Sequence, residues 1–284
     1  MKAELRLGVT CIALVLLAAC STVRFAYDNA DAFVRWRVGQ FLDLQGEAAD
    51  ELDERIDAFL RWHRVQALPK YAREADEAAR RLARGLSRED PLWGYDSLLA
   101  RAREGLRAAA ERIAPMLDRL TPEQVQHIEQ RIAEENRTFA RENLRGSERE
   151  RRERRAQRII DRLEDWLGNL SKAQVERVRR YSERARLLEE LRDRDNKRLQ
   201  ADVLAIIRAR EAQERLAERV VNWEKGRDPA YAAARAASWQ EFNTLLLDID
   251  RTLSREQRAR AVAQLRRYAE DFRVLAARAP VGGR

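Results

Sequence analysis

Apolar residues recur at three- and four-residue steps along almost the whole chain, and signals for β-strands are nearly absent. Leu52, Ile56, Phe59, His63 and Ala67 show this spacing, which places them on one face of a helix. No sustained alternation of Val, Ile or Thr occurs, and no Asn-Gly or Asp-Gly pair marks a hairpin turn. Ala, Leu, Glu and Arg dominate, as they do in long helices. The sequence therefore predicts an all-α fold.

The composition limits the class of protein. Of the 284 residues, 45% are hydrophobic and 37% are charged. This balance excludes a membrane protein rich in spanning segments, and it also excludes a disordered tail. We expect an elongated bundle of about six to eight helices, some long and kinked, in one all-helical domain over residues 31–278, with a flexible tail over 279–284.

Capping residues, prolines and glycines divide the pattern into expected helices. Asp90 and Pro91 start one helix, with Asp90 as the N-cap and Pro91 at the first helical position. The helix beginning at Thr121 either continues to residue 166 or breaks at Gly146-Ser147, and residues 171–223 form one helix or two. The remaining helices are expected over 27–44, over 47–84 with a kink at Pro69, over 231–249 and over 254–277.

The first 20 residues have the organisation of a bacterial lipoprotein signal. The basic segment Met1–Arg6 precedes the apolar stretch Leu7–Ala19, which at about 13 residues is too short to span a bilayer. The sequence Leu17-Ala18-Ala19-Cys20 then resembles the lipobox of bacterial lipoproteins. This resemblance implies cleavage between Ala19 and Cys20, a diacylglyceryl group on the Cys20 sulfur and an acylated amine. The alternative is an ordinary signal peptide with an incidental cysteine.

The lipobox resemblance sets the expected location. Residues 1–19 are a signal peptide, residues 20–30 a lipidated tether, and the acyl chains bind the membrane. Ser21, where Asp would favour the inner membrane, favours the periplasmic face of the outer membrane. No nucleic-acid partner is expected there, although Lys+Arg exceed Asp+Glu by 56 − 48 = 8. The chain also lacks a Gly-rich phosphate-binding loop.

Two stretches concentrate the positive charge. Residues 145–158 carry a net charge of +4 and residues 251–267 a net charge of +5. Either stretch forms a solvated helix face with ion pairs between neighbouring turns, or it contacts an anionic partner such as an anionic lipid or an acidic segment of another envelope protein. The candidate contacts are Arg149, Arg151, Arg152, Arg154, Arg155, Arg258 and Arg260.

One short motif, L-[ST]-x-x-Q, occurs three times. The hydroxyl of the Ser or Thr can accept from the backbone N–H three residues on, while the Gln side chain reaches back to the N–H of the capping residue. The motif thus predicts helix starts by a capping box. Its irregular spacing argues against a solenoid repeat. The pairs are Thr121 with Gln124, Ser171 with Gln174, and Ser254 with Gln257.

Two family resemblances follow from these features. The L-[ST]-x-x-Q motif is similar to the signature of the Spy-type periplasmic chaperones, which implies a helical protein that binds unfolded clients. A second set of residues resembles a family of proteobacterial outer-membrane lipoproteins of unknown function, which implies no catalytic residue. That set is Cys20-Ser21-Thr22-Val23, Tyr27-Asp28-Asn29-Ala30-Asp31, Trp36, Phe41-Leu42-Asp43-Leu44, Arg61-Trp62-His63 and Leu68-Pro69-Lys70-Tyr71.

The chain shows no pattern typical of catalysis. His63 and His127 occur without an H-E-x-x-H motif, and no G-x-S-x-G motif appears. Cys20, the cysteine that stays after cleavage of the signal peptide, is expected to be acylated and so is not a free nucleophile. We therefore expect no catalytic residue, no cofactor and no metal. The sequence favours a non-catalytic binding protein with chaperone-like capacity for envelope proteins; the alternative is a structural adaptor for one envelope-assembly partner or for an anionic envelope component.

Overall fold

The computed structural model describes residues 22–278, and these form helices joined by short turns, with no strand among them. The all-α prediction is confirmed, but the helices outnumber the expected six to eight. They are α2 (Thr22–Asp28), α3 (Ala30–Leu42), α4 (Glu47–Trp62), the π-helical turn η1 (His63–Ala67), α5 (Leu68–Ala83), α6 (Asp90–Leu117), α7 (Pro122–Asn143), α8 (Glu148–Leu167), α9 (Lys172–Arg184), α10 (Glu189–Arg208), α11 (Ala212–Val221), α12 (Pro229–Asp250) and α13 (Arg255–Ala277).

Helix breaks supported by distant residues account for the difference. Residues 171–223 form three helices, whereas the sequence predicted one or two. Between α9 and α10 the backbone becomes extended at Ala185, and between α10 and α11 Arg210 has a φ of +58°. Asp118, from the far end of α6, accepts hydrogen bonds from the backbone N–H groups of Ala212 (2.6 Å) and Gln213 (3.1 Å) at the start of α11. This cap comes from a part of the chain that local patterns do not reach.

The chain does break at Gly146-Ser147, the second of the two alternatives for the segment after Thr121. Gly146 has a φ of +89°, which favours glycine, and Ser147 forms a capping box with Glu150 that starts α8. The expected kink at Pro69 is present as η1. Because Pro69 has no backbone N–H, the turn before it widens while α4, η1 and α5 follow one another without a loop.

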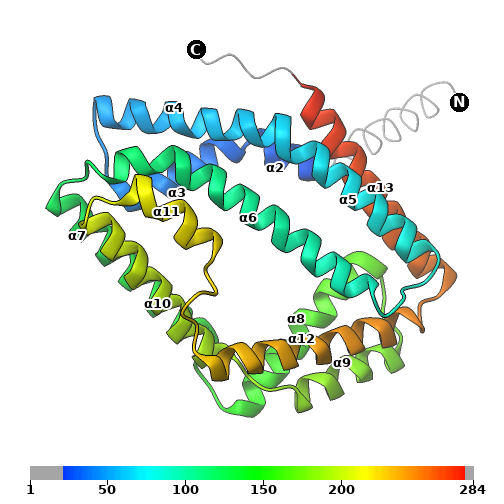
Figure 1. The fold of residues 1–284 in the computed structure, drawn as a ribbon. Helices are drawn as coiled ribbons and strands as arrows, with labels where there is room; N and C mark the ends of the chain where they lie inside the picture. The colour runs from blue at the N-terminus through cyan, green and yellow to red at the C-terminus, as the bar shows by residue number, and fades with distance from the viewer. Residues whose placement is uncertain (1–21, 279–284) are drawn as a thin grey trace, which may run out of the picture.

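The described helices have two separate groups of buried apolar side chains. The first joins α3, α4, α7, α10 and α11 to the C-terminal half of α6, and includes Ile56, Met116 and Ile206. The second joins α8, α9, α12 and α13, and includes Val178 and Ile249. Figure 1 shows the consequence: the helices form an open frame, with α4 and α5 along one edge, α9 and α12 along the opposite edge and α6 running across.

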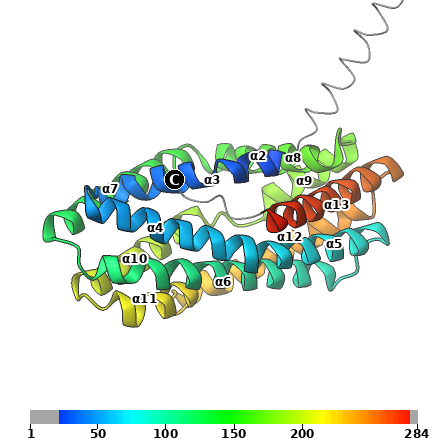
Figure 2. The same ribbon diagram turned by 90° about the horizontal axis from the view of Figure 1, so that it is seen from above.

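The contact of α5 with α13 links the two parts of the frame. Both views show these helices side by side, and Figure 2 shows that the molecule is long and comparatively flat. Helix α2 also packs on α13, where Arg24 Nε donates to Asp271 Oδ1 over 2.6 Å. Residues 22–28, expected to belong to a tether, are therefore part of the folded structure. The proposed signal peptide and the 279–284 tail lie outside the described residues.

Asp90 has a different role from the one expected. Glu89 occupies the N-cap position of α6, and Asp90 is the first helical residue and only 4% exposed. Its carboxylate accepts from the Ser87 backbone N–H (2.7 Å), Arg81 Nη1 (2.6 Å) and Arg84 Nη2 (3.0 Å). Burial opposes ionisation, but these hydrogen bonds outweigh it and lower the pKa of Asp90 from 3.8 to about 2. The carboxylate thus ties the end of α5 to the start of α6.

We expect Asp90→Asn to lower the free energy of unfolding at pH 7 by about 2–3 kcal/mol, the value that corresponds to this pKa shift. Because the pKa is lower in the folded state, the contribution is complete above pH 4 and is lost as the pH falls towards 2. Urea titrations at pH 7 and pH 2.5 measure it. Asp96→Asn, which changes an exposed carboxylate on the same helix, should cost less than about 0.5 kcal/mol. Equal losses for both variants would contradict this role for Asp90.

Candidate functional site

All three L-[ST]-x-x-Q motifs form the capping box that the sequence predicts. In each, the Gln backbone N–H donates to the hydroxyl of the capping residue, and the Gln side chain accepts from the N–H of that residue. The N–H to Oε1 distances are 2.9 Å for Thr121 and Gln124, 2.9 Å for Ser171 and Gln174, and 3.1 Å for Ser254 and Gln257. The motifs therefore satisfy the backbone donors at the starts of α7, α9 and α13.

The second and third motifs also bind each other. Gln174 Nε2 donates to Gln257 Oε1 (3.0 Å), and Gln257 Nε2 donates to Gln174 Oε1 (3.1 Å). Each amide then donates its other hydrogen to the opposite turn: Gln174 to the Thr252 carbonyl (3.1 Å) and Gln257 to the Asn169 carbonyl (2.9 Å). Asn169 and Thr252 both lie two residues before their capping serines, so the arrangement has local twofold symmetry. We call it the amide pair.

In the amide pair, both side-chain amides have all of their hydrogen-bonding groups occupied. Gln174 is 1% exposed, and each Oε1 accepts twice while each Nε2 donates twice. Such a fully satisfied buried network gives a specific contact. It holds the α8–α9 turn against the α12–α13 turn, and so aligns α9 beside α12. The hydrogen bonds of Gln124 within the described residues, in contrast, are those of its own capping box with Thr121.

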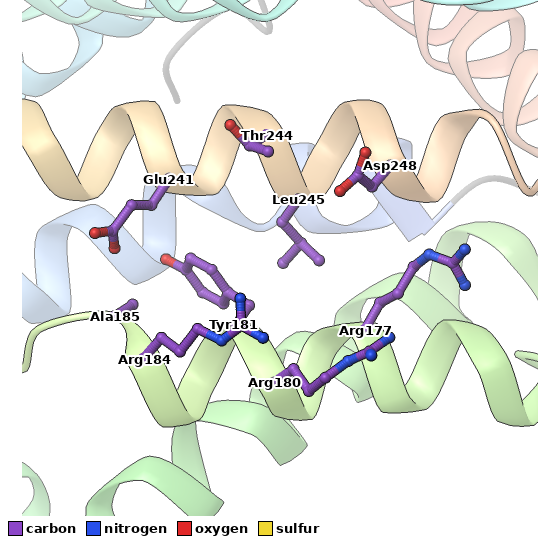
Figure 3. A pocket seen from close by; sticks show the side chains of 9 residues that line it. All are labelled: Arg177, Arg180, Tyr181, Arg184, Ala185, Glu241, Thr244, Leu245 and Asp248. Carbon is purple, nitrogen blue, oxygen red and sulfur yellow. The ribbon is translucent and has the colours of Figure 1, made fainter.

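A groove lies between α9 and α12, with a cavity of about 430 Å³ (Figure 3). From α9 it is lined by Arg177, Arg180, Tyr181 and Arg184, which recur at three- and four-residue steps and so share one helix face. From α12 it is lined by Glu241, Thr244, Leu245 and Asp248. Figure 3 shows the Tyr181 ring and the Leu245 side chain between the two helices.

The charges of the groove are only partly neutralised within the protein. Arg180 is 3.9 Å from Glu176, and Asp248 pairs with Arg251 at 2.8 Å. Arg177 donates to the Ala173 carbonyl, and within the described part of the chain neither Arg177 nor Arg184 pairs with a carboxylate. The groove thus presents two available guanidinium groups, which suit a carboxylate or phosphate.

Aromatic side chains extend the groove towards α6. Tyr181 also lines a second cavity of about 650 Å³, together with Tyr95, Trp239 and Phe242. The ring centroids of Tyr95 and Trp239 are 4.5 Å apart, and those of Tyr181 and Phe242 are 6.0 Å apart. Burial raises the pKa of the Tyr181 phenol, so the phenol stays neutral and, with these rings, forms an aromatic floor. Cationic and aromatic groups together can bind an acidic segment that also carries apolar side chains.

The arginines that the sequence singled out on α8 serve mostly the fold itself. Arg155 donates to the carbonyls of Ser182 (2.5 Å) and Ala185 (2.7 Å), and so caps the end of α9. Arg151 pairs with Glu190 at 2.9 Å and Arg152 with Glu148 at 2.5 Å. Arg154 donates to the Arg145 carbonyl at 2.5 Å. Arg149, with an 85% exposed side chain and a single pair at 3.7 Å to Glu153, remains available to a partner.

The two candidates on α13 lie near the turns. Arg258 donates to Asp250 Oδ1 (2.7 Å) and to the Leu82 carbonyl (2.6 Å), which joins α5 to the α12–α13 turn. Arg260 is exposed beside Gly168, close to the amide pair. The groove arginines on α9 were missed by sequence reasoning. The sequence does contain a signal for them, because Arg177, Arg180 and Arg184 recur at three- and four-residue steps and so share one helix face. A search for apolar residues at that spacing does not detect cationic ones.

The two histidines occupy structural positions. Burial lowers the pKa of His63, whose Nδ1 is 3.1 Å from the Tyr27 hydroxyl, and its ring packs against Tyr71. His127 Nε2 is 3.1 Å from the Gln40 carbonyl. Within residues 22–278 no group of His, Cys, Asp and Glu could hold a metal ion, and none of the helices there is long and apolar enough to cross a membrane.

The three copies of one motif allow a matched comparison. Gln174→Leu removes one donor and one acceptor from the Gln257 amide and the side-chain donor from the Thr252 carbonyl, and we expect it to lower the free energy of unfolding by about 2–4 kcal/mol. Gln124→Leu removes only the reciprocal half of an exposed cap and should cost about 1 kcal/mol or less. Urea titrations of both variants measure the difference. Equal costs would mean that the amide pair adds nothing beyond capping.

Comparison with known proteins places the chain in a family. The model of a family of unknown function, DUF6279, matches residues 40–231, which is more than half of the chain and includes α9 and the start of α12. No curated protein and no solved structure matches the chain. The description of the family names neither a lipid anchor nor a chaperone. On this match, the chain belongs to the DUF6279 family of unknown function.

Proposed function

We propose that this protein is a non-catalytic, lipid-anchored binding protein of the bacterial outer membrane, with chaperone-like capacity for envelope proteins. The groove between α9 and α12 holds acidic segments that also carry apolar side chains. The observation that carries the proposal is the presence of Arg177 and Arg184, without carboxylate partners in the described chain, beside the aromatic floor at Tyr181.

The open shape of the groove supports binding of a segment of protein. The cavities of about 430 and 650 Å³ share Tyr181 and so form a continuous surface along α12. An extended segment can place carboxylates on the arginines and apolar side chains on Trp239 and Phe242. Such contacts are tolerant of sequence, because aromatic surfaces and guanidinium groups accept many partners. That tolerance favours the chaperone-like function over an adaptor for one partner.

Exposed aromatic side chains near the start of the described chain support attachment to a membrane. Phe25, Phe33 and Trp36 lie on α2 and α3, and all three are exposed. Aromatic rings of this kind insert into the headgroup region of a bilayer. They follow Cys20 closely in the chain, where the lipobox resemblance puts the acyl chains.

Photo-crosslinking in intact cells tests the groove. A photoreactive phenylalanine in place of Thr244, an exposed residue of the groove, should capture many envelope proteins, and more of them under unfolding stress. The same residue in place of Gln126, exposed on α7, should not. Arg177→Glu with Arg184→Glu should reduce capture at least about fivefold, because the charges would then repel acidic segments.

Arg61→Glu with Arg137→Glu is the matched control, since it makes the same change of charge at exposed positions on α4 and α7. Capture that survives reversal of the groove arginines, or that is equal from both crosslinker positions, would contradict the proposal. One dominant product, independent of stress, would replace the chaperone-like function by the adaptor.

The anchor has its own test. Cys20→Ser removes the sulfur that would carry the diacylglyceryl group, and we expect loss of lipidation and of the mature membrane-anchored form. Metabolic labelling with palmitate and fractionation of cell membranes measure both. Labelling that persists in Cys20→Ser would overturn the lipobox assignment.

A further inference from the structure

A third cavity, of different character, lies where α5, α6, α8 and α13 meet. It has a volume of about 550 Å³ and shares no residue with the groove between α9 and α12. Its walls are mainly apolar and aromatic. The largest contributors are Tyr71, Trp93, Leu98, Trp166, Leu265 and Phe272.

The cavity is open to solvent and has unfilled space. Leu98, on its wall, is 73% exposed, which is unusual for a leucine beside two tryptophans. Gly94 also lines it, and a Cβ placed on Gly94 would meet no atom within 4 Å. A cavity of this size lies in the range of small-molecule sites, about 300–1,000 Å³. Its lining would hold a hydrocarbon chain, because each buried methylene contributes about 0.8 kcal/mol.

The mouth of the cavity is cationic. An adjoining hollow shares Glu74, Trp93 and Arg101 with the cavity and adds Lys70, Arg73, Glu77 and Arg80, so four cations and two carboxylates line the mouth. Most of these cations are paired within the protein. Lys70 binds Glu104, Arg80 pairs with Glu77 at 2.5 Å, and Arg101 pairs with Glu104 at 2.5 Å and with Glu74 at 3.2 Å.

Arg73 is the exception at this mouth. It is exposed, and no carboxylate of the described chain forms an ion pair with it. A guanidinium held at the edge of an apolar cavity complements a ligand with an anionic group at one end. Because cations outnumber carboxylates at the mouth, a cationic head group is disfavoured there.

We propose that this cavity binds a single-chain amphiphile with an anionic head group, its acyl tail between Trp93, Trp166 and Phe272 and its head group at Arg73. The site is separate from the groove assigned to protein segments, and neither proposal depends on the other. It gives the protein a contact with one lipid molecule in addition to any anchor at Cys20.

A photoreactive palmitate probe tests this site on the full-length protein in membrane vesicles. After irradiation, mass spectrometry should find the label on peptides that contain residues 93–102 and 265–272, and excess palmitate should compete for it. Gly94→Leu fills the open space of the cavity and should reduce this labelling about tenfold, the change expected when about 1.4 kcal/mol or more of binding is lost.

Gly105→Leu is the matched control, because Gly105 lies on the same helix, has nothing within 4 Å of an added Cβ and does not line the cavity. Both changes replace a helical glycine by a better helix former, so both variants should stay folded, which their melting temperatures check. Labelling of Gly94→Leu at the level of Gly105→Leu would overturn the site.

The head group is tested by the charge at the mouth. Arg73→Glu should reduce labelling by the palmitate probe about fivefold or more, while labelling by a photoreactive fatty alcohol of the same length should change less than about twofold. An equal loss with both probes, or no loss with either, would overturn the assignment of Arg73 to an anionic head group. Labels confined to α2 and α3 would indicate contact with the bilayer only and would overturn the cavity as a binding site.

Discussion

The amide pair of Gln174 and Gln257 determines the arrangement of the second half of the molecule, which consists of α8, α9, α12 and α13. Two helical hairpins, α8–α9 and α12–α13, meet at their turns. The glutamine that caps a helix in one hairpin donates a hydrogen bond to a backbone carbonyl in the turn of the other hairpin. Buried amides are tolerated only when each donor and acceptor has a partner, so the register of the two turns is closely restricted. The position of α9 beside α12, and with it the groove, follows from that register.

The first half of the molecule, which surrounds the first hydrophobic group, has a related contact. There Asp118, at the end of α6, caps the start of α11, so the α6–α7 turn is held against the α10–α11 turn. Each half thus has its own hydrophobic group and its own turn-to-turn contact. The long contact of α5 with α13 joins the halves, and Asp90 fixes the corner between α5 and α6. The helices form an open frame, with the α9–α12 groove in one half and the apolar cavity where α5, α6, α8 and α13 meet.

Contacts within one turn of helix were predictable from sequence, and contacts across the fold were not. Thr121, Ser171 and Ser254 start helices because the capping box needs only residues three apart. The breaks at Ala185 and Arg210 depend on Arg155 and Asp118, which approach from other helices. The arginines of α8 illustrate the same limit: their charge is evident in the sequence, but their use as caps and ion pairs appears only when α9 and α10 are in place.

Hydrogen exchange of the full-length protein, with and without an acidic peptide that contains phenylalanine, tests the central claim most directly. The claim is that the α9–α12 groove, and not the Arg-rich stretch of α8, receives acidic segments. The expected result is slower exchange in residues 177–184 and 241–248 when the peptide is bound, with residues 145–158 unchanged. Slowing confined to residues 145–158, or no slowing at a saturating peptide concentration, would contradict the claim.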